Sequence, residues 1–153
     1  TPTTNNVQIN QYFINRFAVD TSRIYAAGYS AGGETMSRAV SMRPDLYAAY
    51  LHGASQWDGS YAPIAENSVA IYIYMADGDE YYGSAKARSA YENLHDAYEN
   101  AGWSGADIDK VLRIETPDNA FFNEKGIYNY HGGANVVFDD PDNLNWVISH
   151  SKG

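Results

Sequence analysis

The chain has 153 residues, a formal net charge of -9 at pH 7 and no cysteine, with 44% hydrophobic and 19% charged residues. This composition is typical of one globular domain with its own core, and the lack of cysteine excludes a disulfide framework or a thiolate metal site. The 10 Lys and Arg residues are scattered and no apolar run approaches the length of a membrane helix, so we expect neither a nucleic-acid partner nor a membrane span.

Helical and extended patterns alternate along the chain. The expected helices cover residues 6–17, 32–42, 84–100 and 142–149, with a short helix or turn at 107–112. The expected strands cover residues 23–27, 47–51, 69–75 and 111–115, and residues 55–67 are expected to form a loop. This alternation predicts the α/β class, a parallel sheet with helices on both faces.

The hexapeptide GYSAGG at residues 28–33 follows an apolar run and precedes a helical pattern. A G-x-S-x-G pattern between a strand and a helix is typical of a nucleophile elbow, in which glycines let the two elements approach closely. Ser30 would then stand at a helix start, where the helix dipole and free N–H groups favour a developing oxyanion. Alternatively, Ser30 only caps the helix. The flanking elements favour the nucleophile.

A serine nucleophile needs a base and a carboxylate to orient that base, and hydrolases with this elbow carry them in the order Ser, Asp or Glu, His. The acidic segment ADGDEYYG follows the predicted strand at 69–75 and offers three carboxylates: Asp77, Asp79 and Glu80. We favour Asp79, because Gly78 before it permits a sharp turn. Asp58, after the preceding strand, is a second candidate. Alternatively, the segment is a solvated turn in which Asp79 caps the next helix.

Four histidines are candidates for the base: His52, His95, His131 and His150. His52 precedes the acid in the chain, and His95 and His150 fall in helical patterns. His131 lies in the loop YNYHGGA, and the two glycines after it would let its imidazole swing over the serine. Alternatively, it is only a turn residue. The order of serine, acid and histidine favours His131 as the base.

Cofactor and metal motifs are missing. Gly33 is followed by Glu34 rather than by the Lys and Ser/Thr of a phosphate-binding P-loop, and the dinucleotide fingerprint G-x-G-x-x-G is absent. The acidic stretch DDPDN at 139–143 lacks the Gly and Glu that an EF-hand calcium loop requires. It is better explained as a helix N-terminus.

Three segments carry a family resemblance. VDTSRIYAAGYSAGGETMSRA resembles the elbow region of α/β-hydrolase-fold serine esterases, in particular the polyhydroxybutyrate-depolymerase-like and feruloyl-esterase-like group. ADGDEYYGSAKAR is similar to the acid loop of that group, and YHGGANVVFDDPDNLNWVISH resembles its histidine loop and final helix. The resemblance implies Ser30 as nucleophile, His131 as general base and then acid, and Asp79 as the group that orients the imidazole. It also implies the backbone N–H of Ala31 as one oxyanion donor, and no metal or cofactor.

The resemblance begins at the helix before the nucleophile strand. We therefore expect residues 1–153 to be a single domain that forms the C-terminal part of an α/β-hydrolase catalytic domain. The front half would hold the first strands and the loop with the second oxyanion donor. Without those strands, the strand at 23–27 would expose an apolar parallel edge. We therefore expect an N-terminal fragment of the same hydrolase to accompany the chain and to be needed for full activity. Alternatively, the chain is a truncated domain that catalyses poorly.

The expected activity is hydrolysis of a small-molecule carboxylic ester through a Ser-His-Asp triad and an acyl-enzyme. Only the resemblance favours an ester over an amide, because the triad serves both. The alternative enzyme is a prolyl-oligopeptidase-like peptidase. An alternative of another class is a non-catalytic fragment that binds carbohydrates or phenolic compounds, ligands that suit 14 tyrosines together with Trp57 and Trp103.

Overall fold

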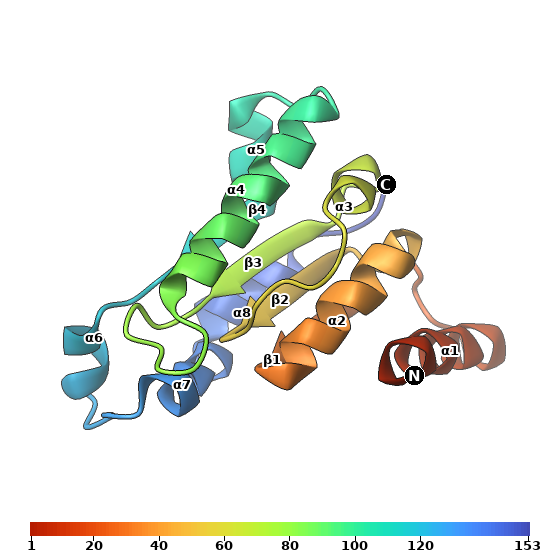
Figure 1. Ribbon diagram of the computed structural model, residues 1–153. Coiled ribbons are helices and arrows are strands. Elements are labelled where there is room, and N and C mark those ends of the chain that lie inside the picture. The colour runs from red at the N-terminus through yellow and green to blue at the C-terminus, as the bar shows by residue number, and fades with distance from the viewer.

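A computed structural model describes residues 1–153 and contains one parallel sheet with the strand order β1-β2-β3-β4. The strands are β1 (Tyr25–Tyr29), β2 (Ala49–Gly53), β3 (Ala70–Tyr74) and β4 (Leu112–Glu115). The helices are α1 (Pro2–Arg16), α2 (Ala31–Met42), α3 (Ala62–Glu66), α4 (Ser84–Asn100), α5 (Gly105–Val111), α6 (Asn119–Asn123), α7 (Tyr130–Gly133) and α8 (Pro141–Ile148), with the 3₁₀ helices η1 (Pro44–Leu46) and η2 (Ala134–Phe138) (Figure 1).

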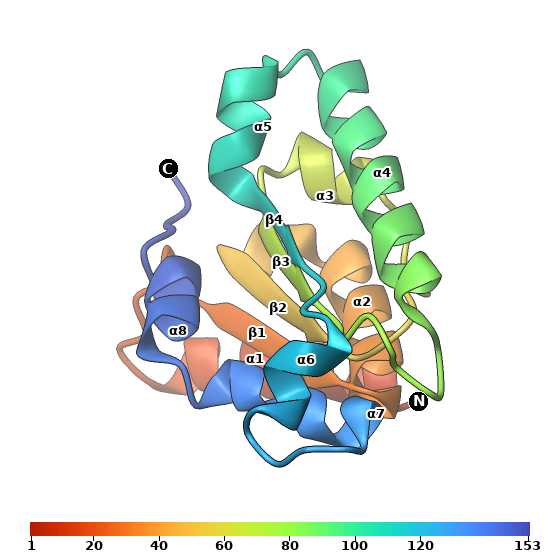
Figure 2. The same ribbon diagram turned by 90° about the vertical axis from the view of Figure 1, so that its left-hand side faces the viewer.

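The sheet separates two apolar cores. Helices α2, α3, α4 and α5 cover one face, over a core that includes Tyr50, Ile71, Ile73, Leu94 and Ile108. Helices α6 and α8 and the 3₁₀ helix η2 cover the other face, over Leu51, Tyr72, Phe122, Val137 and Val147. Figure 2 shows the resulting layers, with α8 and α4 on opposite sides of the strands. Helices on both faces of a parallel sheet confirm the predicted fold class.

The central strands β2 and β3 are buried along their whole length, as expected for parallel strands that helices cover on both sides. The strands β1 and β2 begin and end two residues later than predicted. The reason is that Gly28 and Gly53 take part in the strand pairing, Gly28 with His52 and Gly53 with Tyr29. Helix α3 lies within the predicted loop at 55–67. No helix is both long and apolar enough to cross a membrane.

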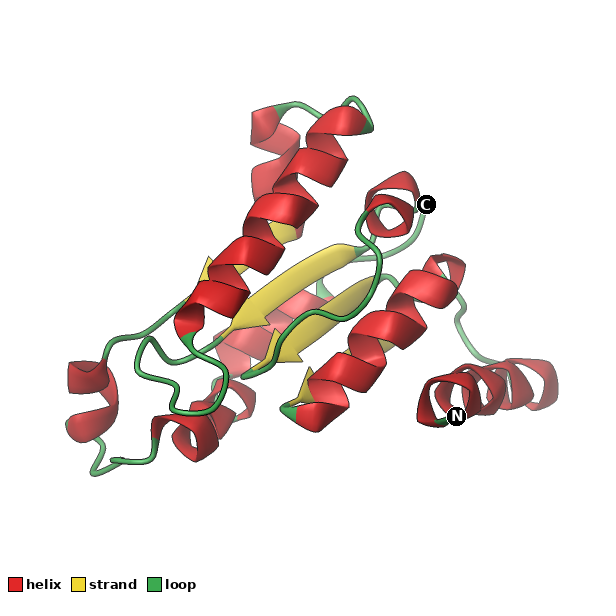
Figure 3. Ribbon diagram, viewed as in Figure 1, coloured by secondary structure: helices red, strands yellow, loops and turns green.

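The parallel order of the sheet brings distant parts of the chain together. Because all four strands run in the same direction, the turn after β1 and the loop after β3 lie at the same edge of the sheet. The segment with α6 and α7 lies at that edge as well (Figure 3). These three segments hold the predicted nucleophile, acid and base.

Candidate active site

Ser30 lies in the turn between β1 and α2, with φ 54° and ψ -129°. A positive φ is uncommon for a residue with a side chain, and at a strand-to-helix turn it raises the serine above the sheet. The turn also requires two glycines: a Cβ on Gly28 would lie 2.7 Å from the Gly32 carbonyl oxygen, and a Cβ on Gly33 would lie 2.5 Å from Cβ of Ser55. The sequence thus forms the elbow geometry that its motif predicts.

The three predicted residues lie in one hydrogen-bonded chain. Ser30 Oγ is 3.0 Å from His131 Nε2, and His131 Nδ1 is 2.7 Å from Asp79 Oδ2. The Asp79 side chain is 0% exposed and the His131 side chain is 20% exposed. With the Nδ1 proton of a neutral imidazole donated to Asp79, Nε2 is left as an acceptor for the serine proton. This arrangement is the one that general-base activation of a serine requires.

Asp79 is held by its own loop. Its Oδ1 accepts the backbone N–H groups of Tyr81, Tyr82 and Gly83, at 2.9, 2.7 and 3.4 Å. The sequence also allowed a role in which Asp79 only caps a turn. Its Oδ1 has this capping role, whereas its Oδ2 contacts His131. Because both oxygens have donors, the carboxylate is fixed in the orientation that aligns the imidazole.

The backbone of His131 is held from two sides. The Glu80 carboxylate accepts the N–H groups of Tyr130 and His131, at 2.9 and 2.7 Å. The Tyr29 hydroxyl donates to the His131 carbonyl. Burial, together with the charge of Asp79, raises the pKa of Tyr29 to about 12, so this hydroxyl keeps the proton that it donates. The sequence pattern indicated Glu80 only as an alternative acid and gave no sign of Tyr29.

The Glu80 contact predicts a pH dependence of the histidine loop. Hydrogen bonds, first from Tyr130 and then from His131, lower the pKa of Glu80 below its ordinary value of 4.5. Because the folded pKa lies below the unfolded one, the contact is fully present above pH 4.5 and is lost as the pH falls through the folded pKa. We expect the amide proton shifts of Tyr130 and His131 to titrate together below pH 4.5, as measured by NMR.

Glu80→Gln is the matched control for this titration. Its carboxamide does not titrate in this range, and its NH₂ group takes the place of one of the two oxygens that accept the N–H groups. The common titration of the two amides should disappear in this variant. An unchanged titration would show that another group moves the loop.

Aromatic rings surround the imidazole. The ring centroids of Tyr81, Tyr82 and Tyr29 lie 5.3, 5.7 and 5.9 Å from that of His131. The Tyr82 hydroxyl also donates to Glu34 Oε1 at 2.7 Å, which ties the acid loop to the first turn of α2. These contacts restrict rotation of the imidazole. In the sequence, the high number of tyrosines was the only sign of them.

Ala31 is the first residue of α2. The N–H groups of Gly33 and Glu34 donate to the carbonyl of Ser30, at 2.8 and 3.3 Å. The N–H of a first helical residue has no acceptor within its own helix. The Ala31 N–H next to Ser30 is therefore left without an acceptor in α2, and its role as an oxyanion donor stays a prediction.

The other candidates from the sequence have different partners. Asp58 pairs with Arg38, and Asp77 pairs with Arg88. His52 is buried within β2, where its Nδ1 lies 2.7 Å from the Tyr50 hydroxyl. Burial lowers the pKa of His52 to about 4, so its imidazole is neutral at pH 7 and is committed to the core rather than to Ser30.

Comparisons with known proteins bear on the family and the fold of this chain. A family model described as "Prolyl oligopeptidase family" matches residues 4–105, about two thirds of the chain, including Ser30 and Asp79. A solved structure described as "Crystal Structure of a Thermostable Esterase" matches with a TM-score of 0.77 and 20% sequence identity, over 99% of this chain and 37% of that chain. A search of curated proteins finds no match. The predicted α/β-hydrolase fold is confirmed by these matches.

Proposed function

Because this chain belongs to the prolyl oligopeptidase family, and is thus a serine hydrolase of the α/β-hydrolase type, we propose that it hydrolyses small-molecule carboxylic esters. Ser30 is the nucleophile, His131 the general base and Asp79 the group that orients it. The proposal rests on the hydrogen-bonded chain from Ser30 Oγ through both nitrogens of His131 to the buried Asp79 carboxylate.

The first half of the reaction forms an acyl-enzyme. Ser30 Oγ attacks the ester carbonyl carbon while its proton passes to His131 Nε2. Negative charge develops on the carbonyl oxygen, and the N–H of Ala31 at the start of α2 is one donor to it. The C–O bond to the alcohol then breaks, and His131 returns the proton to the departing alkoxide. Asp79 stays ionised and stabilises the imidazolium between these steps.

The second half releases the acid. Water attacks the acyl carbon while His131 Nε2 accepts a proton from it, and the second tetrahedral intermediate collapses with Ser30 Oγ as leaving group. His131 gives its proton back to Ser30, so the site returns to its starting state. No step requires a residue other than the three named and the oxyanion donors.

Covalent labelling tests the nucleophile. A fluorophosphonate probe reacts with an activated serine, and peptide mapping should place the adduct on Ser30. The adduct should be lost in His131→Ala, because the hydroxyl then has no base within reach. A folded protein without any adduct would contradict the proposal.

The choice between esters and peptides is tested on substrates. The esterase neighbour favours esters, whereas the name of the family favours prolyl peptides. We expect turnover of p-nitrophenyl acyl esters and no cleavage of a glycyl-prolyl p-nitroanilide, both followed by release of the chromophore. Efficient cleavage of the anilide would instead identify a peptidase, and both activities should disappear in Ser30→Ala.

We further propose that residues 1–153 are the C-terminal part of a hydrolase catalytic domain, whose N-terminal part pairs with the open edge of β1. β1 is an outer strand with Ala27 exposed. Helix α1, which packs against α2, exposes Tyr12 and Phe13, and Phe17 directly after the helix is exposed as well, each of them more than half accessible; such a patch marks an interaction surface. Native mass spectrometry of the protein from its source should detect the additional polypeptide, either linked to this chain or bound to it. An isolated 16.9 kDa species would contradict the proposal.

A further inference from the structure

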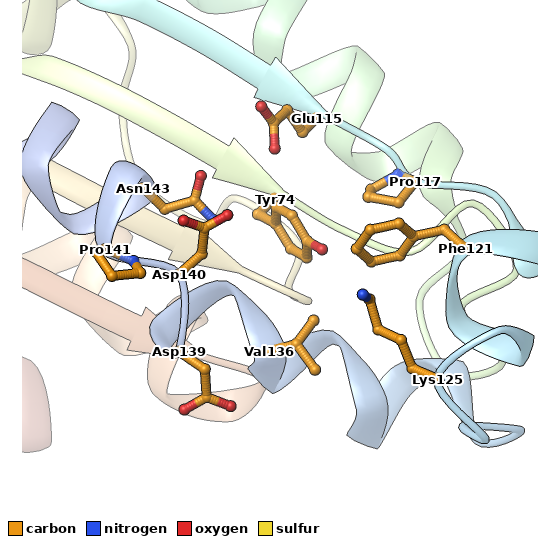
Figure 4. Close-up of a pocket in the computed structure, with 10 residues that line it drawn as sticks. All are labelled: Tyr74, Glu115, Pro117, Phe121, Lys125, Val136, Asp139, Asp140, Pro141 and Asn143. Atoms are coloured by element: carbon orange, nitrogen blue, oxygen red, sulfur yellow. The ribbon is translucent and has the colours of Figure 1, made fainter.

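A cavity of about 520 Å³ opens near the carboxyl ends of β3 and β4, beside α6 and the start of α8. The residues that matter most in its lining are Tyr74, Glu115, Phe121, Lys125, Asp140 and Asn143 (Figure 4). None of Ser30, Asp79 and His131 lines it. Its volume is within the range of small-molecule sites, so it is a candidate for a second ligand.

Tyr74 ends β3 and is only 3% exposed, yet its hydroxyl forms no hydrogen bond with the protein. Figure 4 shows this hydroxyl pointing into the cavity, toward Phe121 and Lys125. By contrast, the hydroxyl of Tyr72, two residues earlier, lies 2.7 Å from Glu115 Oε2 and 2.8 Å from Asn143 Oδ1. The hydroxyl oxygen is not among the fully buried side-chain atoms that lack a partner, so it is accessible from the cavity and can form a hydrogen bond with a group that enters it. Tyr74 therefore offers a polar group to a ligand.

The carboxylates of Glu115 and Asp140 line the cavity around this hydroxyl together with one ammonium group, that of Lys125. Glu115 is paired with Arg113, but Asp140 has no ion-pair partner in the chain. Burial raises the pKa of Tyr74 to about 12, and the charges of Glu115 and Asp140 contribute to the shift. The hydroxyl is therefore neutral at pH 7, and the Asp140 carboxylate, whose charge acts on it, favours a cation in the space between them.

The apolar wall of the cavity already accepts a cation. The Lys125 ammonium nitrogen lies 4.6 Å from the centroid of the Phe121 ring, a cation–π distance. Lys125 is exposed and forms no ion pair within the chain, so its flexible side chain can withdraw when a ligand enters. Val136 and Pro117 extend the apolar surface beside Phe121.

We propose that this cavity binds a small organic cation, an ammonium group attached to an apolar or aromatic body. The ammonium donates to the Tyr74 hydroxyl and to the Asp140 carboxylate, and the apolar body packs against Phe121. This site is separate from Ser30, so the proposal does not depend on the proposed hydrolytic function.

Three probes of similar shape test the charge: phenethylammonium, the neutral 2-phenylethanol and the anionic 3-phenylpropanoate. Binding is measured by calorimetry and by NMR shifts of the amides of Tyr74 and Asp140. We expect the cation to bind about tenfold or more tightly than either analogue. Equal or tighter binding of the alcohol or the anion, or no binding of any probe at millimolar concentration, would overturn the proposal.

Conservative variants test the two polar partners. Tyr74→Phe and Asp140→Asn should each weaken binding of the cation by about tenfold. Asn still caps helices well, so the N-cap of α8 that Asp140 provides is kept. Asp139→Asn is the matched control, because Figure 4 shows its carboxylate pointing away from Tyr74, and it should have a smaller effect.

Two further variants test the role of Lys125 and the independence of this cavity from Ser30. Lys125→Met removes a competing ammonium and should leave the affinity for the cation unchanged or increase it. Ser30→Ala should bind the cation with unchanged affinity, whatever its hydrolytic activity. Unchanged binding in folded Tyr74→Phe and Asp140→Asn, as checked by thermal unfolding, would refute the assignment of these partners.

Discussion

Replacing Ser30 with alanine is expected to lower the turnover of an ester substrate by about 10⁶-fold. The variant removes the only hydroxyl within hydrogen-bond distance of His131 Nε2, and no covalent acyl-enzyme can form without it. Binding of the substrate should change little, because the side chain loses a single oxygen. The measurement is kcat for a p-nitrophenyl ester under saturating substrate.

Ser89→Ala is the control for this variant. Ser89 lies on the exposed side of α4, and its replacement should leave kcat within about twofold, since surface changes remote from a site have small effects. If Ser30→Ala kept most of the activity, another nucleophile would have to act. If it bound carbohydrate or phenolic ligands as the wild type does, and the wild type had no turnover, the non-catalytic alternative would apply.

Replacing Asp79 with asparagine is expected to lower kcat by about 10⁴-fold. Oδ1 of Asp79 accepts three backbone N–H groups, so in the variant the amide oxygen keeps that position and the NH₂ group faces His131. An NH₂ donor at Nδ1 forces the imidazole into the tautomer with its proton on Nε2. That nitrogen then cannot accept the serine proton, although the fold is kept.

Asp77→Asn in the same loop is the matched control. Asp77 is half-exposed and contacts Ser84 and Arg88 rather than His131, so the variant should keep kcat within about twofold. The pH dependence of kcat and the shift of the His131 ring protons, followed by NMR, should report the changed tautomer only in Asp79→Asn. Similar losses in both variants would indicate a disturbed loop instead.

The sequence predicted those elements whose pattern is local. Helix α4 covers residues 84–100 as expected, because its apolar residues recur at helical spacing over several turns. The helices α3, α6 and α7 span five, five and four residues, which is too short for a period to be recognised. The strands were found from their apolar residues, but their ends depend on glycines that a sequence pattern assigns to turns.

For the site, the motif and the chain order were sufficient to name Ser30, Asp79 and His131, which the fold brings into contact; their catalytic roles stay predictions. The partners of the histidine backbone were not identified, because Glu80 and His131 are 51 positions apart and no local pattern links them. The family model extends to residue 105 and leaves the predicted base, His131, outside its range. The Tyr74 cavity was also missed, because an unpartnered hydroxyl becomes visible only when the surrounding chain is in place.

The adjacent positions of Asp79 and Glu80 affect how this protein can be engineered. The Asp79 carboxylate orients the His131 imidazole, and the Glu80 carboxylate holds the main chain of the same residue. The acidic turn and the histidine loop would therefore have to be transferred together into another protein. If only the histidine loop of another hydrolase replaced the loop of this protein, the new histidine would face carboxylates from a different acidic turn, and its imidazole would be held in a different orientation. Chimeras that exchange both segments together are the ones in which the base should keep its alignment.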